Sequence, residues 1–190
     1  MRKRVFVIHG WGGNPQEGWL PWLKRELENK DFAVEIPLMP DTENPKIETW
    51  IPYLAEIVGN TDENTYFVGH SIGCQTILRY LESLPGNKKI GGAVFVAGWF
   101  NLMNLGEDEK KIAKPWIVVP INFEKIKQHS TKFIAIFSDN DDVVPFENKK
   151  LFEQKLNAQT ITEHQKGHFS GGDGITKLPV VLNAVLEFAK

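Results

Sequence analysis

Short apolar runs alternate with longer amphipathic stretches along the chain. The apolar runs are rich in β-branched residues and lack a clean polar–apolar alternation, which is typical of strands buried on both faces of a parallel sheet. We expect strands at Arg4–Ile8, Ala33–Pro37, Thr65–Gly69, Gly92–Ala97, Lys132–Phe137 and Gln159–Thr162. Strands separated by helical patterns predict an α/β fold, with a doubly wound, mostly parallel sheet of about six strands.

The stretches between these runs carry apolar residues at intervals of three and four, which is the spacing of an amphipathic helix. The apolar positions of the predicted helices are Trp19, Leu20, Leu23 and Leu27; Ile47, Trp50, Ile51, Leu54, Ile57 and Val58; Ile77, Leu78, Tyr80, Leu81 and Leu84; Leu151, Phe152 and Leu156; and Val180, Val181, Ala184, Val185 and Phe188. We expect these helices to cover both faces of the sheet.

Residues 99–130 interrupt the alternation because they are too many for an ordinary strand-to-helix connection. They combine the charged segment Glu107–Lys114 with the largely apolar sequence KPWIVVPINFEKIKQ. We expect them to form a short, lid-like excursion over one end of the sheet, within a single domain of residues 1–190.

The composition is that of a soluble globular protein, with 42% hydrophobic and 24% charged residues. A formal net charge of -2 offers no basic surface to nucleic acid. No segment approaches the ~20 apolar residues of a membrane span. The one cysteine, Cys74, excludes an internal disulfide and fits a reducing compartment. We therefore predict a cytoplasmic protein without a nucleic-acid partner or a membrane span.

The sequence GHSIG at Gly69–Gly73 follows a predicted strand and precedes a predicted helix. In this context Gly-x-Ser-x-Gly indicates a nucleophilic serine on a strained turn, where side chains at the two glycine positions would collide with neighbouring backbone. The following helix directs its first N–H groups toward negative charge that develops near Ser71. The alternative interpretation is that Ser71 only caps the helix.

A serine nucleophile needs a base and an orienting carboxylate, and candidates for both lie downstream in the order that this fold requires. Asp139, Asp141 and Asp142 follow the fifth predicted strand, at the edge where catalytic groups of parallel sheets gather. His168 comes after the last predicted strand and directly follows Gly167. We expect Ser71 and these groups to share one rim of the sheet.

The other histidines and the possible metal sites fit this chemistry less well. We expect His164 to pack or face solvent, His129 to be exposed in a polar loop, and His70 to pack against the sheet. His164 and His168 would need a third zinc ligand, and no residue has a recognisable spacing for that role. A calcium loop in the acidic cluster is excluded because Val144 stands where that loop requires glycine. We predict no metal and no cofactor.

The loop after the first strand, VIHGWGG, is expected to complete an oxyanion hole. Its glycines leave the N–H of Trp11 pointing inward, and the N–H of Ile72 supplies the second donor. A nucleotide site is the alternative for such a loop. Gly10, Gly12 and Gly13 do not form the G-x-G-x-x-G fingerprint, and no phosphate-binding Gly-Lys-Ser/Thr is present.

Aromatic and apolar residues of the excursion are candidates for a substrate pocket. They are Trp99, Phe100, Met103 and Trp116. The alternative is a satellite apolar cluster that packs beneath a loop and has no contact with substrate.

These motifs resemble the α/β-hydrolase superfamily, and more closely the small, capless serine hydrolases of the retinoblastoma-binding protein 9 type. The resemblance spans essentially the whole chain, through HGWGGNPQEGWLPWLKREL, IPLMPDTENPKIETWIPYL, VGHSIGC, KPWIVVPINFEKIKQ, SDNDDVVP and KGHF. It implies an α/β-hydrolase domain with Ser71 as nucleophile, His168 as base and Asp141 as acid. Asp141 is favoured over its neighbours because Val144-Pro145 follow it at the spacing seen after the acid in many α/β hydrolases.

Together these features predict a metal-independent serine hydrolase that cleaves a small carboxylic ester through an acyl-enzyme. Its partner would be a small-molecule acyl substrate. An amidase or a thioesterase would use the same triad. A binding protein that keeps the hydrolase fold without its activity is the alternative from a different class.

Overall fold

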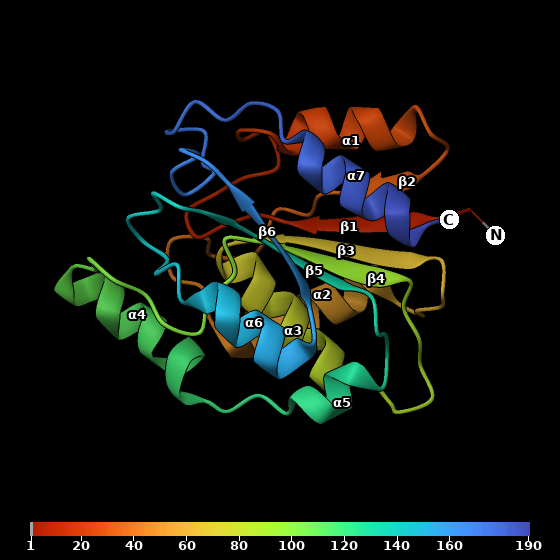
Figure 1. The fold of residues 1–190 in the computed structure, drawn as a ribbon. Coiled ribbons are helices and arrows are strands. Elements are labelled where there is room, and N and C mark those ends of the chain that lie inside the picture. Colours follow the sequence, from red (N-terminus) through yellow and green to blue (C-terminus); the bar gives the residue numbers. More distant parts are fainter. Residues whose placement is uncertain (1) are drawn as a thin grey trace.

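The computed structural model describes residues 2–190, which form one parallel sheet with helices on both faces (Figure 1). The strands are β1 (Arg4–Ile8), β2 (Ala33–Glu35), β3 (Thr65–His70), β4 (Gly92–Val96), β5 (Phe133–Ser138) and β6 (Gln159–Glu163). They lie in the order β2-β1-β3-β4-β5-β6, and every neighbouring pair is parallel. The predicted fold class is confirmed. Only β2 is clearly shorter than predicted, ending before Pro37, which has no N–H to donate to a neighbouring strand.

The helices divide between the two faces of the sheet, as a doubly wound fold requires. Helices α1 (Leu20–Glu28) and α7 (Pro179–Phe188) cover one face, and α2 (Ile47–Val58), α3 (Ile72–Ser83) and α6 (Asn148–Leu156) cover the other (Figure 1). All residues of β3, β4 and β5 are buried, which explains why these strands read as continuous apolar runs.

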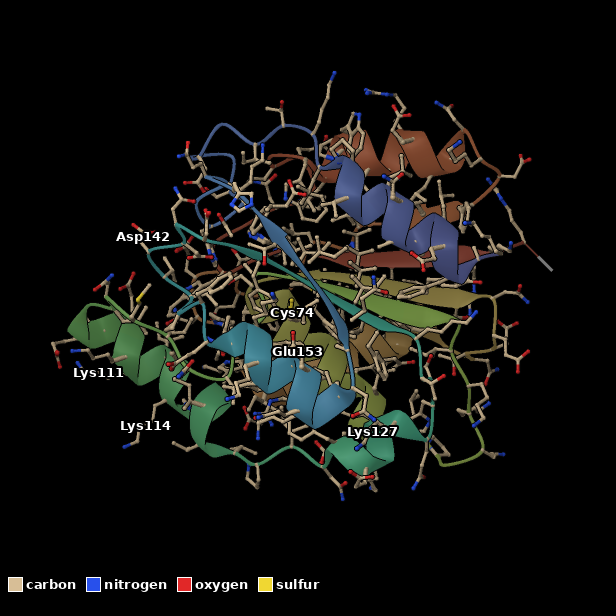
Figure 2. The ribbon with its side chains drawn as sticks, in the orientation of Figure 1. Cys74, Lys111, Lys114, Lys127, Asp142 and Glu153 are labelled. Atoms are coloured by element: carbon tan, nitrogen blue, oxygen red, sulfur yellow. The ribbon has the colours of Figure 1, made fainter. Side chains whose placement is uncertain are left out.

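The excursion at residues 99–130 contains two helices, α4 (Glu107–Val118) and α5 (Phe123–Lys127). Helix α4 lies at the edge of the molecule, and its Lys111 and Lys114 side chains point away from the sheet (Figure 2). Only Ala113 and Trp116 of this helix are buried. Its apolar stripe is therefore too narrow to produce the helical pattern found in the other helices.

One expectation about a histidine is wrong: His129 is buried. Its ring Nδ1 lies 2.9 Å from the Lys88 carbonyl oxygen, and its own carbonyl accepts a hydrogen bond from the Ile90 N–H at 3.0 Å. These contacts hold the segment before β4 against the end of α5. The polar sequence around His129 concealed this contact because its partners lie about forty residues earlier.

No helix within residues 2–190 is both long enough and apolar enough to cross a bilayer.

Candidate active site

Ser71 stands on a sharp turn between β3 and α3. Its backbone has φ 52° and ψ -118°, a conformation that costs a non-glycine residue on the order of 1–3 kcal/mol. Two hydrogen bonds hold the turn: the Ser71 N–H donates to the Val96 carbonyl at 2.9 Å, and the Cys74 N–H donates to the Ser71 carbonyl at 3.0 Å. The strain is thus maintained by the strand and helix on either side.

The two glycines of GHSIG are required by close backbone contacts. A Cβ at position 69 would lie 2.7 Å from the Cys74 nitrogen, and one at position 73 would lie 2.3 Å from the Ile8 oxygen. Both distances are too short for any side chain. The glycines let α3 approach β3 and β1 closely enough to form the turn that carries Ser71.

The Ser71 hydroxyl does not cap α3. Ser71 occupies the position before the first helical residue, but its side chain makes no capping hydrogen bond. It instead lines a cavity of about 390 Å³ at the carboxyl edge of the sheet. The local structure therefore does not support the capping interpretation.

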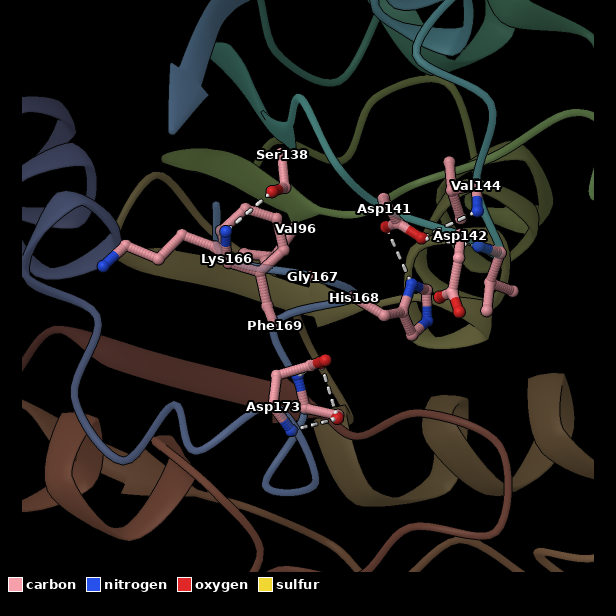
Figure 3. Close-up of polar contacts among 12 residues, drawn as sticks. Val96, Ser138, Asp141, Asp142, Val144, Lys166, Gly167, His168, Phe169 and Asp173 are labelled. Carbon is pink, nitrogen blue, oxygen red and sulfur yellow. Dashed lines mark hydrogen bonds and ion pairs between the residues drawn. The ribbon is translucent and has the colours of Figure 1, made fainter. Parts of the chain in front are cut away.

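His168 and Asp141 meet on neighbouring loops after β6 and β5. The His168 Nδ1 lies 2.9 Å from Asp141 Oδ2, and because a carboxylate only accepts, Nδ1 carries the proton and Nε2 is left free (Figure 3). The other Asp141 oxygen accepts the N–H groups of Val143 and Val144, both at 2.9 Å. The Asp141 side chain is only 3% exposed, so its position is fixed from both sides.

The loops that carry these two residues are joined along their length. The side chains of Ser138 and Asn140 accept hydrogen bonds from the Lys166 and Gly167 N–H groups, both at 2.9 Å. Asp139 accepts the N–H of Gln165 at 2.9 Å and also contacts His164. We call these contacts of residues 138–141 with residues 164–168 the β5–β6 clasp. It includes the Asp141–His168 pair as its last member.

Asp173 supports the loop that carries His168 from its other side. Its carboxylate accepts hydrogen bonds from the N–H and hydroxyl of Ser170, at 2.9 and 2.7 Å (Figure 3). A Cβ on Gly167 would lie 2.2 Å from this carboxylate, and Gly167 has φ 54°, so any other residue would be strained there. Burial opposes ionisation of Asp173, but the hydrogen bonds from Ser170 and the backbone of His168 outweigh it and lower its pKa.

Ser71 and His168 line the same cavity, but no hydrogen bond joins them within residues 2–190. Contacts between a catalytic hydroxyl and its base are often long in ligand-free enzymes. The free Nε2 of His168 is therefore available to a proton from Ser71 or from a water molecule.

The loop after β1 also reaches this cavity. The Gly13 N–H donates to the Gly10 carbonyl at 3.2 Å, and the Gly12 N–H donates to Thr42 at 2.9 Å. The Trp11 N–H makes no hydrogen bond within the described chain, and Ile72 begins α3, where an N–H has no acceptor inside the helix. Trp11 and Ile72 both line the cavity.

Two of the four residues predicted to form the pocket line this cavity. Trp99 and Met103 belong to its wall, together with Leu102, Asn104 and Leu105. Phe100 does not, because its ring packs between Phe123 and Phe152. Trp116 is also elsewhere: it is buried against Trp50 and donates its indole N–H to the Pro45 carbonyl at 2.9 Å.

Several cavity residues had no signal in the sequence that we recognised. They are Glu17, Glu43, Leu102, Asn104, Leu105, Glu109, Val143 and Ser170. Met103 and Asn104 help to hold the cavity wall, because the Met103 N–H and the Asn104 amide donate to the Val143 and Asp142 carbonyls, at 2.9 and 2.7 Å. These contacts join residues about forty positions apart, which a local motif cannot reveal.

The remaining acidic and histidine side chains of this edge do not form a metal site. Asp139 and the exposed His164 pair with each other at 2.6 Å, outside the cavity lining. No group of three or more His, Cys, Asp or Glu side chains within residues 2–190 is arranged to hold a metal ion.

Known proteins are similar to this chain over nearly its whole length. The serine hydrolase family model matches residues 5–187. A protein of Bacillus subtilis (strain 168) named "Putative hydrolase YdeN" is 31% identical over 188 residues, covering 99% of this chain and 97% of its own. The crystal structure of the B. subtilis ydeN gene product matches with a TM-score of 0.90 at 30% identity, covering 98% of each chain.

Two further proteins are less similar to the chain, one in sequence and one in fold. "Serine hydrolase RBBP9" of Rattus norvegicus is 28% identical over 169 residues, covering 88% of this chain and 87% of its own. The structure of Est1E from Butyrivibrio proteoclasticus with ferulic acid bound has a TM-score of 0.75 at 16% identity, covering 98% of this chain and 87% of that one.

Proposed function

The chain belongs to the serine hydrolase family, and from this premise we propose that it cleaves small carboxylic esters through an acyl-enzyme on Ser71. The observation that carries the proposal is the 2.9 Å contact of His168 Nδ1 with the buried Asp141, at the cavity that Ser71 also lines. It fixes the tautomer that leaves Nε2 as a base.

In the first half-reaction His168 Nε2 takes the Ser71 proton as Oγ attacks the carbonyl carbon. The oxyanion that forms accepts hydrogen bonds from the N–H groups of Trp11 and Ile72. Asp141 stabilises the imidazolium, which then gives its proton to the departing alcohol. In the second half-reaction His168 activates a water molecule, and the acid is released from Ser71.

We further propose a cytoplasmic location and a small-molecule acyl partner. The one thiol of the chain is buried and unpaired, as is common in a reducing compartment.

Labelling with a fluorophosphonate and turnover of short-chain nitrophenyl esters test the nucleophile. The wild-type protein should react with the label and hydrolyse the esters, whereas Ser71→Ala should lose labelling and at least about 10³-fold in kcat. His168→Ala should lose a similar factor. A folded wild-type protein that neither labels nor turns over an ester contradicts the proposal.

The acid is tested by two matched substitutions. Asp141→Asn should lower kcat by about 10⁴-fold, because an amide favours the wrong tautomer of His168. Asp139→Asn removes one charge from the same loop without touching His168, and should cost much less. The reverse order would assign the acid to Asp139.

A further inference from the structure

The walls of the catalytic cavity carry formal charge of one sign. Glu17, Glu43 and Glu109 line the cavity, and none of the described residues that line it is a lysine or an arginine. The whole chain is nearly balanced, with 22 basic and 24 acidic residues. The cavity is therefore much more acidic than the chain as a whole.

Two of these carboxylates flank the loop that carries Trp11. Glu43 Oε1 lies 3.4 Å from the position that a Cβ would take at residue 12, and Glu17 Oε2 lies 3.0 Å from the corresponding position at residue 13. The Trp11 indole N–H also donates to the Glu43 carbonyl at 3.0 Å, which holds Glu43 against the loop. Both carboxylates thus lie against the loop that carries the proposed oxyanion donor, with Glu17 half-buried and Glu43 exposed.

Neither carboxylate, of Glu17 or of Glu43, has a hydrogen-bonded or ion-paired partner among the described residues. The Glu109 carboxylate, in contrast, accepts the Gly106 N–H at 2.7 Å at the start of α4. Glu109 therefore has a structural role that Glu17 and Glu43 lack.

Unpaired negative charge beside an oxyanion hole opposes the reaction of a neutral ester, because the transition state is itself negative there. A positive group on the substrate, next to the scissile carbonyl, removes this electrostatic penalty. Glu17 and Glu43 attract that group, and the group offsets the charge of the oxyanion. An anionic substrate would be repelled by the same two side chains.

We propose that Glu17 and Glu43 are specificity-determining residues that select esters with an ammonium group close to the scissile carbonyl, such as α-amino acid esters. The inference rests on the proposed ester hydrolysis at Ser71. The overall reaction is the same: water adds to the acyl carbon, the C–O bond breaks, and an amino acid and an alcohol are released.

Three ethyl esters of similar size test the selectivity: those of L-alanine, propionic acid and hydrogen succinate, compared at slightly acidic pH, where the amine is protonated. The measured quantity is kcat/KM for the alanine ester divided by that for the propionate ester. The Glu17→Gln/Glu43→Gln double variant should lower this ratio by about tenfold relative to wild type, the loss of two ion pairs of ordinary strength. Intrinsic differences in ester reactivity cancel in this comparison.

The succinate ester should gain in the double variant, and added salt should lower the wild-type ratio. Glu56→Gln, an exposed position of α2 outside the cavity, serves as the control and should leave the ratio unchanged. Retained turnover of the propionate ester shows that the double variant is folded, and the two single variants should each show part of the effect.

The outcomes separate the two proposals. An unchanged ratio in a double variant that still hydrolyses propionate overturns the charge selectivity and leaves ester hydrolysis intact. Failure of the wild-type protein to label with a fluorophosphonate and to hydrolyse any of the three esters overturns both.

Discussion

His70 connects three of the loops that build the cavity. Its Nε2 lies 2.8 Å from the carbonyl oxygen of His168, so Nε2 carries the proton and donates to the loop that carries His168. Its Nδ1 lies 3.1 Å from where a Cβ of Gly10 would stand, and its ring packs edge-on against Trp19. The sequence predicted that His70 packs, but its contact with His168 spans 98 positions and left no local signal.

The burial of His70 predicts a loss of stability in mild acid. Burial, followed by the nearby His168, lowers the pKa of His70 from 6.5 to about 4. Between these values the unfolded chain binds a proton at this site and the folded chain does not. The free energy of unfolding therefore does not suffer from His70 above about pH 6.5. As the pH falls from 6.5 to about 4, protonation of His70 in the unfolded chain lowers it by an amount on the order of 3 kcal/mol.

The measurement is urea unfolding at several pH values for the wild-type protein and for His70→Phe, which keeps an aromatic ring. The free energy of unfolding should fall less steeply with acid in the variant. Curves for the two proteins that run parallel through this pH range would show that another group carries the effect.

At the level of elements, the β5–β6 clasp joins the loop that carries Asp141 to the loop that carries His168. Neighbouring parallel strands end at the same edge, so four successive residues, Ser138, Asp139, Asn140 and Asp141, meet the backbone or side chains of residues 164–168. The sequence SDNDD indicated that an acid lies in this loop, but not which partner each of its side chains contacts. Which aspartate faces His168 depends on the alignment of two loops that only the fold brings together.

The clasp predicts a kinetic effect for a residue that does not touch the reacting atoms. Asn140→Ala removes the acceptor of the Gly167 N–H, one residue before His168, and should lower kcat by about tenfold with little change in KM. Asn140→Asp keeps an acceptor oxygen and should recover much of the loss. Asp142→Asn, at an exposed neighbour, is the control; a wild-type kcat in Asn140→Ala would exclude a positioning role.

A helix could be predicted from the sequence when enough of its residues are buried to give a regular apolar pattern. Helices α1, α2, α3, α6 and α7 pack an apolar stripe on the sheet, and their periodicity predicted them. Helix α4 buries only Ala113 and Trp116, so its charged first half carried no such pattern. Phe100 and Trp116 were wrongly predicted to line the cavity. Their positions depend on how residues 99–130 pack against the rest of the fold, which the sequence pattern does not reveal.

Across the whole molecule, the parallel sheet explains why the main features of the site could be predicted. Strands β1, β3, β5 and β6 all end at one edge, so the loops of Trp11, Ser71, Asp141 and His168 converge there. The structure of the cavity wall could not be predicted from the positions of the strand ends. It depends on long-range contacts such as that of the Asn104 amide with the Asp142 carbonyl at 2.7 Å, which no local pattern encodes.

Because Cys74 is buried in the first turn of α3, the reactivity of its thiol reports the unfolding of the protein. Its thiol lies 3.2 Å from the Gly69 carbonyl and is fully buried, and burial raises its pKa, so a thiol reagent reaches it only when the helix leaves the sheet (Figure 2). Since no other cysteine is present, each molecule gives one modification event.

Modification of Cys74 should therefore be slow in buffer and should accelerate with urea in proportion to the globally open population. Mass spectrometry after timed exposure to the reagent would measure it. Reaction in buffer as fast as in the denatured protein would mean that the turn at Ser71 opens independently of the core. Agreement with global unfolding would mean that this strained turn is as stable as the sheet that holds it.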